Sequence, residues 1–235
     1  MPAADVPDGI NRAAWLQNAG GPVDAARRRW VRRLGALGAV LLPAAAAGER
    51  LRRPTPAQVP GPFRPLELPA DHDNDLTTVQ GHPGVAQGSI VEVNGQVLLP
   101  SGLPVAGARV LLWQVNGHGR YHHPDDDTDT PLDPCFQGCG VTLTDALGRY
   151  RFRTIRPPAY AGRAPHMHLA VDAGRGRSLV TQLYLAGDPG NAGDGLLGAL
   201  DPEARERLMV RFAPAGGSGV PSGRFDVVLG AETIR

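Results

Sequence analysis

The chain has 235 residues, 42% of them hydrophobic, and a formal net charge of +1, so it can bury one core and gives no electrostatic case for binding nucleic acid. All 24 basic residues are arginine, which excludes enzymes that need a Schiff-base lysine or a Walker-type phosphate loop. The 31 glycines and 23 prolines are about twice the usual share of these residues and favour a turn-rich β protein.

The N-terminal segment is typical of an export signal. Residues 27–32 read Arg-Arg-Arg-Trp-Val-Arg, which fits the twin-arginine pattern, and an apolar run from Leu34 to Leu42 follows. That run is far shorter than the ~20 residues that span a bilayer, so we expect no stable membrane anchor. Pro43 and the alanines at 44–47 would supply a cleavage region. We therefore expect residues 1–47 to be a twin-arginine signal peptide and the protein to be periplasmic or extracellular. An arginine-rich amphipathic or core helix is the alternative.

Residues 48–86 are rich in proline and lack hydrophobic periodicity, which predicts a long extended arm that wraps the core or leads to it. The arm contains the sequence Asp71-His-Asp-Asn-Asp75. Such a cluster could bind calcium or iron, but short acidic turns are more often solvated.

Residues 87–235 alternate short β-rich runs with glycine and proline, which predicts an all-β domain with a β-sandwich core. The predicted strands are Ser89–Leu99, Ala108–Val115, Arg149–Ile155, His166–Val171, Ser178–Leu185 and Arg224–Leu229. One short C-terminal helix is expected over Asp201–Phe212, with Asp201 as its N-cap and Pro202 at its first position. Its few apolar residues indicate that it packs at the edge of the core.

His166 and His168 form a His-x-His pair in one predicted strand. Residues i and i+2 of a strand point to the same face, so the two imidazoles lie side by side, as a metal site requires. Imidazole suits zinc, copper, iron and nickel, and the pair alone does not choose among them. Tyr160 precedes the pair by six residues. A phenolate ligand is typical of ferric iron, so this spacing favours a ferric site.

The remaining tyrosines and histidines lie in a polar loop or in predicted strands. The loop at residues 117–127 contains Tyr121 and three histidines, His118, His122 and His123. Each histidine taken singly is more easily explained as an exposed residue of a polar loop than as a metal ligand. Tyr150 shares a strand face with Phe152 and is expected in the core. Gln182 shares a face with Tyr184, and a buried glutamine needs hydrogen-bond partners, which makes Gln182 a candidate pocket residue.

Six segments, found in one order, resemble the intradiol ring-cleavage dioxygenases, on the protocatechuate 3,4-dioxygenase side of that family. They are Leu112–His123, Pro131–Gly138, Thr144–Pro157, Arg163–His168, Thr181–Tyr184 and Arg224–Leu229. In the arm, Asp73–Thr77 resembles a segment that precedes the core in the protocatechuate branch. The resemblance extends over about residues 60–230.

The resemblance implies a mononuclear non-haem Fe(III) site with four protein ligands, Tyr121, Tyr160, His166 and His168. It implies an enzyme that uses O2 to cleave a catechol-type ring between its two hydroxyls, giving a cis,cis-muconate-type diacid. Tyr160 would leave the metal on substrate binding and accept a catechol proton. The family often assembles from like or paired subunits, so a homo-oligomer is compatible with the sequence, although no segment specifies one.

The same resemblance implies roles for residues around the substrate. Arg163 matches an active-site arginine whose fixed charge could stabilise electron density on the ring, although a surface arginine on a turn is the alternative. Gln182 matches a pocket glutamine. Trp113 matches a tryptophan that we expect to be a wall or packing residue.

Two features depart from the protocatechuate pattern. Only Ala161-Gly162 separates Tyr160 from Arg163, where protocatechuate dioxygenases carry a longer stretch. We therefore expect a more open pocket and leave the identity of the catechol undecided. Cys135 and Cys139 could bind a metal, but two close cysteines in an exported protein more often form a disulfide, which would need a turn between them.

Two other function classes would explain part of the sequence. A cupin also carries a His-x-His pair on a strand, but it requires a glutamate after three or four intervening residues, where Asp172 and Ala173 stand. A non-catalytic β-sandwich binding module would explain the strands and the export signal. It would not explain two tyrosines and two histidines in the order of the dioxygenases.

Overall fold

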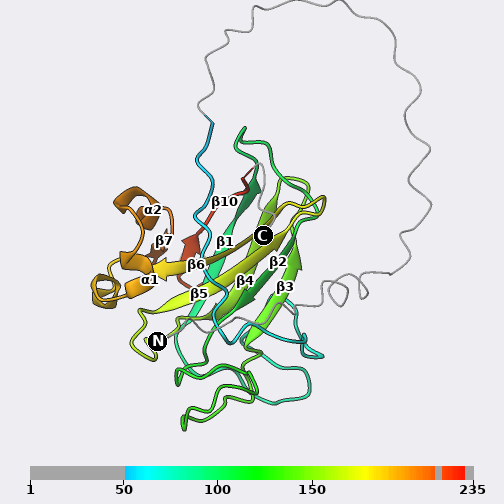
Figure 1. Ribbon diagram of the computed structural model, residues 1–235. Helices are drawn as coiled ribbons and strands as arrows, with labels where there is room; N and C mark the ends of the chain where they lie inside the picture. Colours follow the sequence, from blue (N-terminus) through cyan, green and yellow to red (C-terminus); the bar gives the residue numbers. More distant parts are fainter. Residues whose placement is uncertain (1–50, 215–218, 231–235) are drawn as a thin grey trace, which may run out of the picture. The chain divides into compact units, whose positions relative to one another are not determined.

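Two five-stranded β-sheets packed against each other form the framework of the protein (Figure 1). The structure is a computed structural model and describes residues 51–214 and 219–230. The expected signal peptide, residues 1–47, lies outside the described residues, so export remains a prediction. Within the described ranges, no helix is long and apolar enough to cross a bilayer.

The first sheet is built around β1 (Ile90–Leu98). One side of β1 pairs with antiparallel β4 (Arg149–Ile155). Its other side pairs in parallel with the C-terminal strands β9 (Ser222–Arg224) and β10 (Val227–Val228), and β9 pairs with β8 (Phe212–Ala213).

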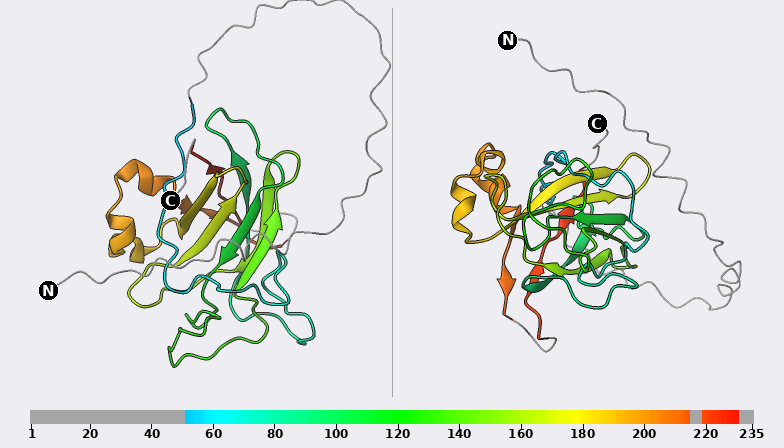
Figure 2. Two further views of the ribbon diagram at one scale, coloured as in Figure 1. Left: turned by 45° about the vertical axis from the view of Figure 1, so that its right-hand side comes forward. Right: turned by 90° about the horizontal axis from the view of Figure 1, so that it is seen from below.

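The second sheet carries the order β3-β2-β5-β6-β7. Its strands are β3 (Cys139–Leu143), β2 (Arg109–Trp113), β5 (His166–Asp172), β6 (Ser178–Leu185) and β7 (Met209–Val210). All pairs are antiparallel except β6 with β7. Between β6 and β7 the chain forms three short helices at one end of the sheet (Figures 1 and 2): η2 (Pro189–Ala192), α1 (Gly195–Gly198) and α2 (Pro202–Glu206).

Strand β5 shows how the core is separated from the outer face of the second sheet. Met167, Leu169 and Val171 belong to the buried apolar cluster between the sheets. Because alternate residues of a strand point to opposite faces, His166 and His168 point away from that cluster. Both histidines are nevertheless buried, so another part of the chain must cover this outer face.

The proline-rich arm provides part of that cover. It crosses the second sheet close to β5 and β6 (Figures 1 and 2). The backbone N–H of Gln58 donates to Val180 O, and the hydroxyl of Thr181 donates to Pro56 O. Gly61 lies so close to His168 that a Cβ at this position would approach His168 Cε1 to 3.4 Å.

The structure confirms the all-β fold and most of the predicted strands. Five of the six predicted strands correspond to β1, β2, β4, β5 and β6, whereas the predicted strand Arg224–Leu229 is divided between β9 and β10. Strand β3 was not predicted. Its five residues include a glycine and lack clear alternation, and its position is set by pairing with β2.

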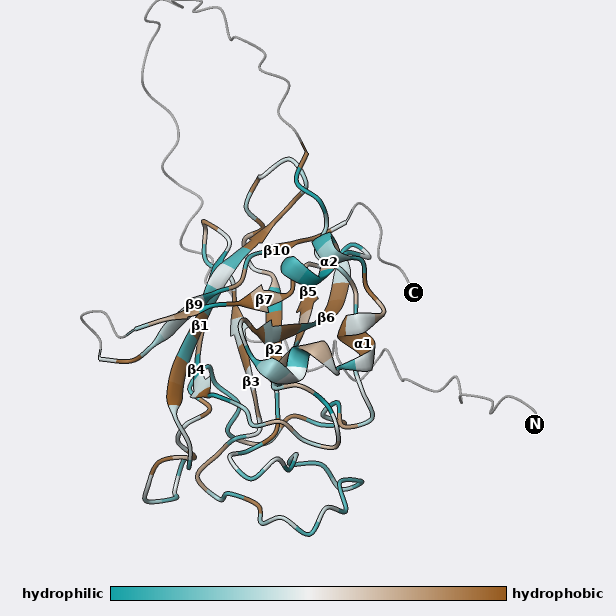
Figure 3. Cartoon of the chain, turned by 90° about the vertical axis from the view of Figure 1, so that its left-hand side faces the viewer, coloured by the Kyte–Doolittle hydropathy of each residue, from teal (hydrophilic) through white to brown (hydrophobic). Residues whose placement is uncertain are grey.

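The C-terminal helix is shorter than expected. Asp201 caps α2 by accepting a hydrogen bond from Ala204 N, and Pro202 is its first residue, both as predicted. The helix ends at Glu206 because Leu208 is buried in the core and Met209–Val210 pairs with β6. Tertiary pairing therefore overrides helical propensity there. Figure 3 shows α2 as largely hydrophilic, in agreement with a helix at the edge of the core.

The acidic cluster at residues 71–75 forms hydrogen bonds within the arm. Asp71 accepts a hydrogen bond from Gln80 N, Asp73 from Asp75 N, and Asp75 from the hydroxyl and N–H of Thr77. Within the described ranges, no group of three or more His, Cys, Asp or Glu side chains is arranged to hold a metal ion. These carboxylates therefore form turns.

The expected disulfide is absent, because Cys135 and Cys139 are both free thiols. The backbone N–H of Gln137 donates to Leu76 O, and Gly138 O accepts from Gln114 N. This pairing holds the segment between the cysteines against its neighbours, and Cys135 Sγ lies 3.8 Å from Pro83 O of the arm. Burial raises the pKa of the Cys139 thiol to about 12, which makes it a poor nucleophile.

Candidate metal centre and active site

The register of the second sheet gathers the predicted site residues on its outer face. His168 in β5 lies opposite Trp113 of β2 and opposite Gln182 of β6. Two residues earlier in β5, on the same face, His166 lies opposite Tyr184 of β6. The Trp113 indole stacks on the His168 imidazole with ring centroids 4.8 Å apart and planes 10° apart. Trp113 is therefore a packing residue behind His168, as expected.

Tyr121 reaches the same place from the loop that follows β2. The loop is held from inside, because the buried carboxylate of Asp126 accepts a hydrogen bond of 2.7 Å from Tyr121 N. Asn116, also buried, accepts from His118 N and Arg120 N through its side-chain oxygen. The loop therefore presents the Tyr121 phenol in a fixed position.

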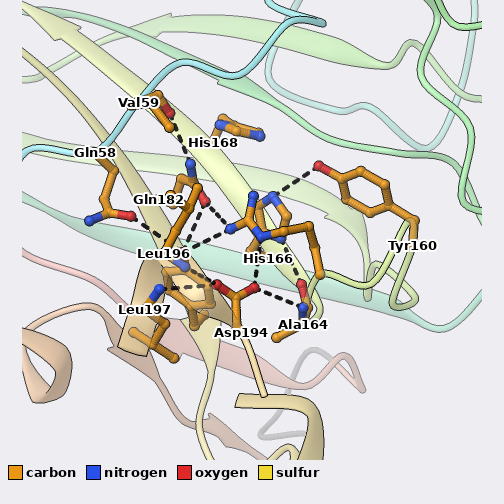
Figure 4. Close-up of polar contacts among 12 residues, drawn as sticks. Gln58, Val59, Tyr160, Ala164, His166, His168, Gln182, Asp194, Leu196 and Leu197 are labelled. Atoms are coloured by element: carbon orange, nitrogen blue, oxygen red, sulfur yellow. Dashed lines mark hydrogen bonds and ion pairs between the residues drawn. The ribbon is translucent and has the colours of Figure 1, made fainter. Parts of the chain in front are cut away.

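Four donor atoms converge at this point. The Tyr121 and Tyr160 hydroxyl oxygens lie 2.7 Å apart. Tyr160 Oη is 3.0 Å from His166 Nε2, and Tyr121 Oη is 3.0 Å from His168 Nε2. Figure 4 shows the Tyr160 hydroxyl directed at His166, with His168 nearby. All four predicted metal ligands are thus brought together.

The two imidazoles are in the state that a metal requires. His166 Nδ1 lies 2.7 Å from Ala164 O, so this nitrogen carries the proton and Nε2 presents its lone pair. Burial lowers the pKa of His166 to about 4, and burial also lowers the pKa of His168 well below its usual value. Both rings are therefore neutral at physiological pH, and neutral imidazole is the form that binds metal ions.

The two phenols need a cation to ionise. Burial raises the pKa of Tyr121 well above its usual value, and the neighbouring Tyr160 raises it further. Burial also raises the pKa of Tyr160, against opposing effects of the hydrogen bond with Tyr121 and the positive charge of Arg163. A strongly charged ion among the four atoms would reverse this balance and stabilise both phenolates. Two phenols and two neutral imidazoles therefore fit a ferric ion.

Comparison with known proteins assigns the family. A family model described as Dioxygenase matches residues 60–231. The chain belongs to the intradiol dioxygenase family. It is 42% identical over 153 residues to the protocatechuate 3,4-dioxygenase beta chain of Burkholderia cepacia, covering 62% of this chain and 64% of that protein.

More distant relatives agree with this family assignment. The chain is 28% identical over 204 residues to the hydroxyquinol 1,2-dioxygenase of Rhizobium sp. (strain MTP-10005), covering 79% of this chain and 64% of that protein. The chain thus spans less than two thirds of the length of these two relatives. Among solved structures, it is 30% identical to the dioxygenase domain of a dioxygenase carbohydrate-binding protein fusion from Streptomyces sp. SirexAA-E. That match has a TM-score of 0.58 and covers 76% of this chain and 99% of the other.

Arg163 stands beside the four donors. Ala161 and Gly162 both have positive φ, at 47° and 74°, and Arg163 N donates to Tyr160 O across the turn. The short connection noted in the sequence is therefore a tight turn that places Arg163 next to Tyr160. The Arg163 guanidinium donates to the Gln182 side-chain oxygen (2.8 Å) and to Tyr184 Oη (3.0 Å).

Gln182, predicted as a pocket residue, joins the sheet, the arm and Arg163. Its side chain is fully buried. The Gln182 side-chain amide donates to Val59 O of the arm at 2.9 Å, and its oxygen accepts from Arg163. Both of its polar ends are thereby satisfied, which explains how a glutamine is tolerated there.

Three features of the site were not predicted. Asp194 is completely buried and pairs with Arg163 at 2.8 Å, although it lies 31 residues further along the chain. Phe63 of the arm packs on Tyr121, with ring centroids 5.1 Å apart. His123 was expected to be exposed but is buried, 5.7 Å from Phe63 between ring centroids. None of the three residues stands in a distinctive sequence motif, and their roles depend on contacts with residues that are distant in the sequence.

A cleft of about 280 Å³ lies between the arm and the core next to Tyr121. Its walls include Phe63, Leu68, Trp113 and Gln137. A larger cleft, about 660 Å³, lies over β1 and β4 and is lined by none of the four donor residues. The donor arrangement therefore identifies the active site better than cleft size does.

Proposed function

We propose that this chain is a mononuclear non-haem Fe(III) enzyme that cleaves a catechol-type ring between its two hydroxyls with O2, giving a cis,cis-muconate-type diacid. The observation that carries the proposal is the convergence of Tyr121, Tyr160, His166 and His168 within 2.7–3.0 Å contacts. Membership of the intradiol dioxygenase family supports the same reaction.

The four side chains would hold the ion through two phenolate oxygens and two imidazole nitrogens. Ferric iron, when bound, would act as a Lewis acid that withdraws electron density from a catechol and makes its ring reactive toward dioxygen. The surrounding residues would exclude bulk water, since His166 and His168 are buried, Gly61 of the arm lies against His168, and Phe63 covers Tyr121. A dry site strengthens every electrostatic contact within it.

Tyr160 would act as the proton acceptor. It is half-buried, whereas Tyr121, His166 and His168 are buried, so Tyr160 is the donor that an incoming substrate reaches first. As a phenolate, its Oη can take the proton of a catechol hydroxyl and become a neutral phenol. Burial favours the neutral form of Tyr160, so this transfer agrees with the surroundings of the group.

Arg163 would stabilise negative charge that develops on the ring. Burial has the largest effect on the pKa of both tyrosines and of both histidines, and the positive charge of Arg163 lowers the pKa of all four groups. This supports a guanidinium placed to act on charge at the site. Gln182 and Tyr184 fix one end of the Arg163 guanidinium by hydrogen bonds. A fixed charge needs no rearrangement when negative charge forms, which is the usual source of electrostatic stabilisation in enzymes.

The substrate class that we propose is the small catechols, which include catechol, protocatechuate and hydroxyquinol. The relatives named above act by their names on protocatechuate and hydroxyquinol. The tight Tyr160–Arg163 turn contains only Ala161 and Gly162, whereas a longer segment is expected of protocatechuate dioxygenases. Oxygen uptake measured in turn with catechol, protocatechuate and hydroxyquinol would rank the three.

Iron loading gives a direct test of the proposal. Protein purified with ferric iron should be red-brown, because electrons transfer from phenolate to iron on absorption of visible light. The band should shift when a catechol is added without oxygen, as the substrate replaces ligands. Protein that binds ferric iron but stays colourless would contradict the assignment of tyrosine ligands.

A further inference from the structure

Four N–H groups converge on the buried carboxylate of Asp194. One oxygen accepts from Arg163 Nε at 2.8 Å and from Ala164 N at 2.9 Å. The other oxygen accepts from Leu196 N and Leu197 N at 3.1 and 3.0 Å, which caps α1. Figure 4 shows Asp194 placed between Ala164 on one side and Leu196 and Leu197 on the other. The carboxylate therefore joins the α1 segment to the turn that carries Arg163.

This arrangement is more than a helix cap. Asp201, the cap of α2, accepts one capping hydrogen bond through one side-chain oxygen and lies on the surface. Asp194 uses both oxygens and is completely buried, whereas its partner Arg163 retains 21% exposure of its side chain. Burial by itself raises the pKa of Asp194, but the hydrogen bonds from Arg163, Leu197 and Ala164 lower it overall. The group is therefore a carboxylate at neutral pH.

The Arg163 guanidinium is held at two of its three nitrogens. Asp194 holds Nε, and Gln182 and Tyr184 hold one terminal nitrogen. Because a guanidinium is planar and rigid, contacts at two of its positions fix the direction of the whole group. Without Asp194, the guanidinium could rotate about its long side chain while still contacting Gln182.

We infer that Asp194 is a positioning residue, which directs the Arg163 guanidinium toward the catechol site and makes the α1 segment part of the active-site framework. The inference rests on the proposed function for its catalytic consequence. The hydrogen bond by which Asp194 holds Arg163 Nε does not depend on whether the chain cleaves a catechol.

The first experiment uses the wild-type protein without iron. The exchange of the Arg163 Nε–H proton with water can be followed by nitrogen-15 NMR, with the signal assigned by its loss in Arg163→Met. Exchange should be at least about tenfold slower than for the exposed Arg175, because the proton is held by a buried carboxylate. Equal exchange rates for the two arginines would overturn the inference, and this result does not depend on catalytic activity.

The second experiment is a double-mutant cycle on the iron-loaded protein. Asn has a single side-chain oxygen, so Asp194→Asn cannot accept all four hydrogen bonds. We expect Asp194→Asn to keep the visible band of the iron site and to lower kcat by roughly 10- to 100-fold, as misplacement of a catalytic group does. In an Arg163→Met background the same change should alter kcat by less than about twofold, since interacting residues are not additive.

The matched control is Asp201→Asn, which makes the same substitution at the cap of α2, where one side-chain oxygen is enough, and should leave kcat unchanged. An equal loss of kcat from Asp194→Asn in both backgrounds, or the same loss in Asp201→Asn, would overturn the positioning role. If the wild-type protein cleaves no catechol, the proposed function fails, and the exchange of the Arg163 proton still decides whether Asp194 holds the guanidinium.

Discussion

Replacing His168 with alanine should release the iron and abolish turnover. The change removes one of four donors together with the ring that stacks on Trp113 and contacts Tyr121. Loss of a residue that only supports a metal ligand lowers metal affinity by about 10- to 100-fold, so loss of a ligand should lower iron affinity by at least about 100-fold. Iron content after dialysis against a weak chelator, together with the visible spectrum, measures the effect.

Two further variants separate ligand loss from misfolding in this test. His82→Ala removes an exposed histidine of the arm and should keep both iron and colour. His168→Gln retains a polar side chain in the buried position and should stay folded, as judged by circular dichroism, while losing iron as alanine does. Full iron content and an unchanged band in His168→Ala would show that this residue is not a ligand.

Tyr160→Phe should keep the protein folded but weaken the visible band and slow turnover. The substitution removes only the oxygen that lies 2.7 Å from Tyr121 Oη and 3.0 Å from His166 Nε2, and it leaves three donors in place. General acid–base groups contribute about 10²–10⁴-fold to rates, so kcat should fall within roughly that range. Stopped-flow absorbance and oxygen uptake would measure the two effects.

Tyr150→Phe is the matched control, because it removes the same atom from a tyrosine in the core. The Tyr150 hydroxyl donates to Phe225 O, and its loss should cost about 1 kcal/mol of stability. The band and kcat should not change. A Tyr160→Phe enzyme with the wild-type band and kcat would contradict the assignment of Tyr160 as both ligand and proton acceptor.

The sequence predicts those parts of the fold that local pattern determines. Strands with strong alternation or β-branched residues, such as Arg149–Ile155 and Ser178–Leu185, have the predicted bounds. The pair His166 and His168 falls on one strand face, because strand periodicity alone decides it. The Asp201-Pro202 start of α2 is likewise local and was predicted correctly.

Features that depend on distant partners were not predictable. The end of α2 is set by β7 pairing with β6, and the short strand β3 is set by its pairing with β2. Asp194 follows a glycine-rich turn that resembles an ordinary surface loop, and its partner Arg163 is far away in the sequence. The free cysteines follow from the way Gln137 and Gly138 pair with other segments, which spacing cannot show.

The fate of dioxygen tests the central claim most directly. Iron-loaded protein should be supplied with a catechol under oxygen-18 gas, and the product should be examined by mass spectrometry. The proposed reaction predicts a ring-opened cis,cis-muconate-type diacid that contains both labelled oxygen atoms. A quinone without label, or a product opened outside the two hydroxyls, would contradict it.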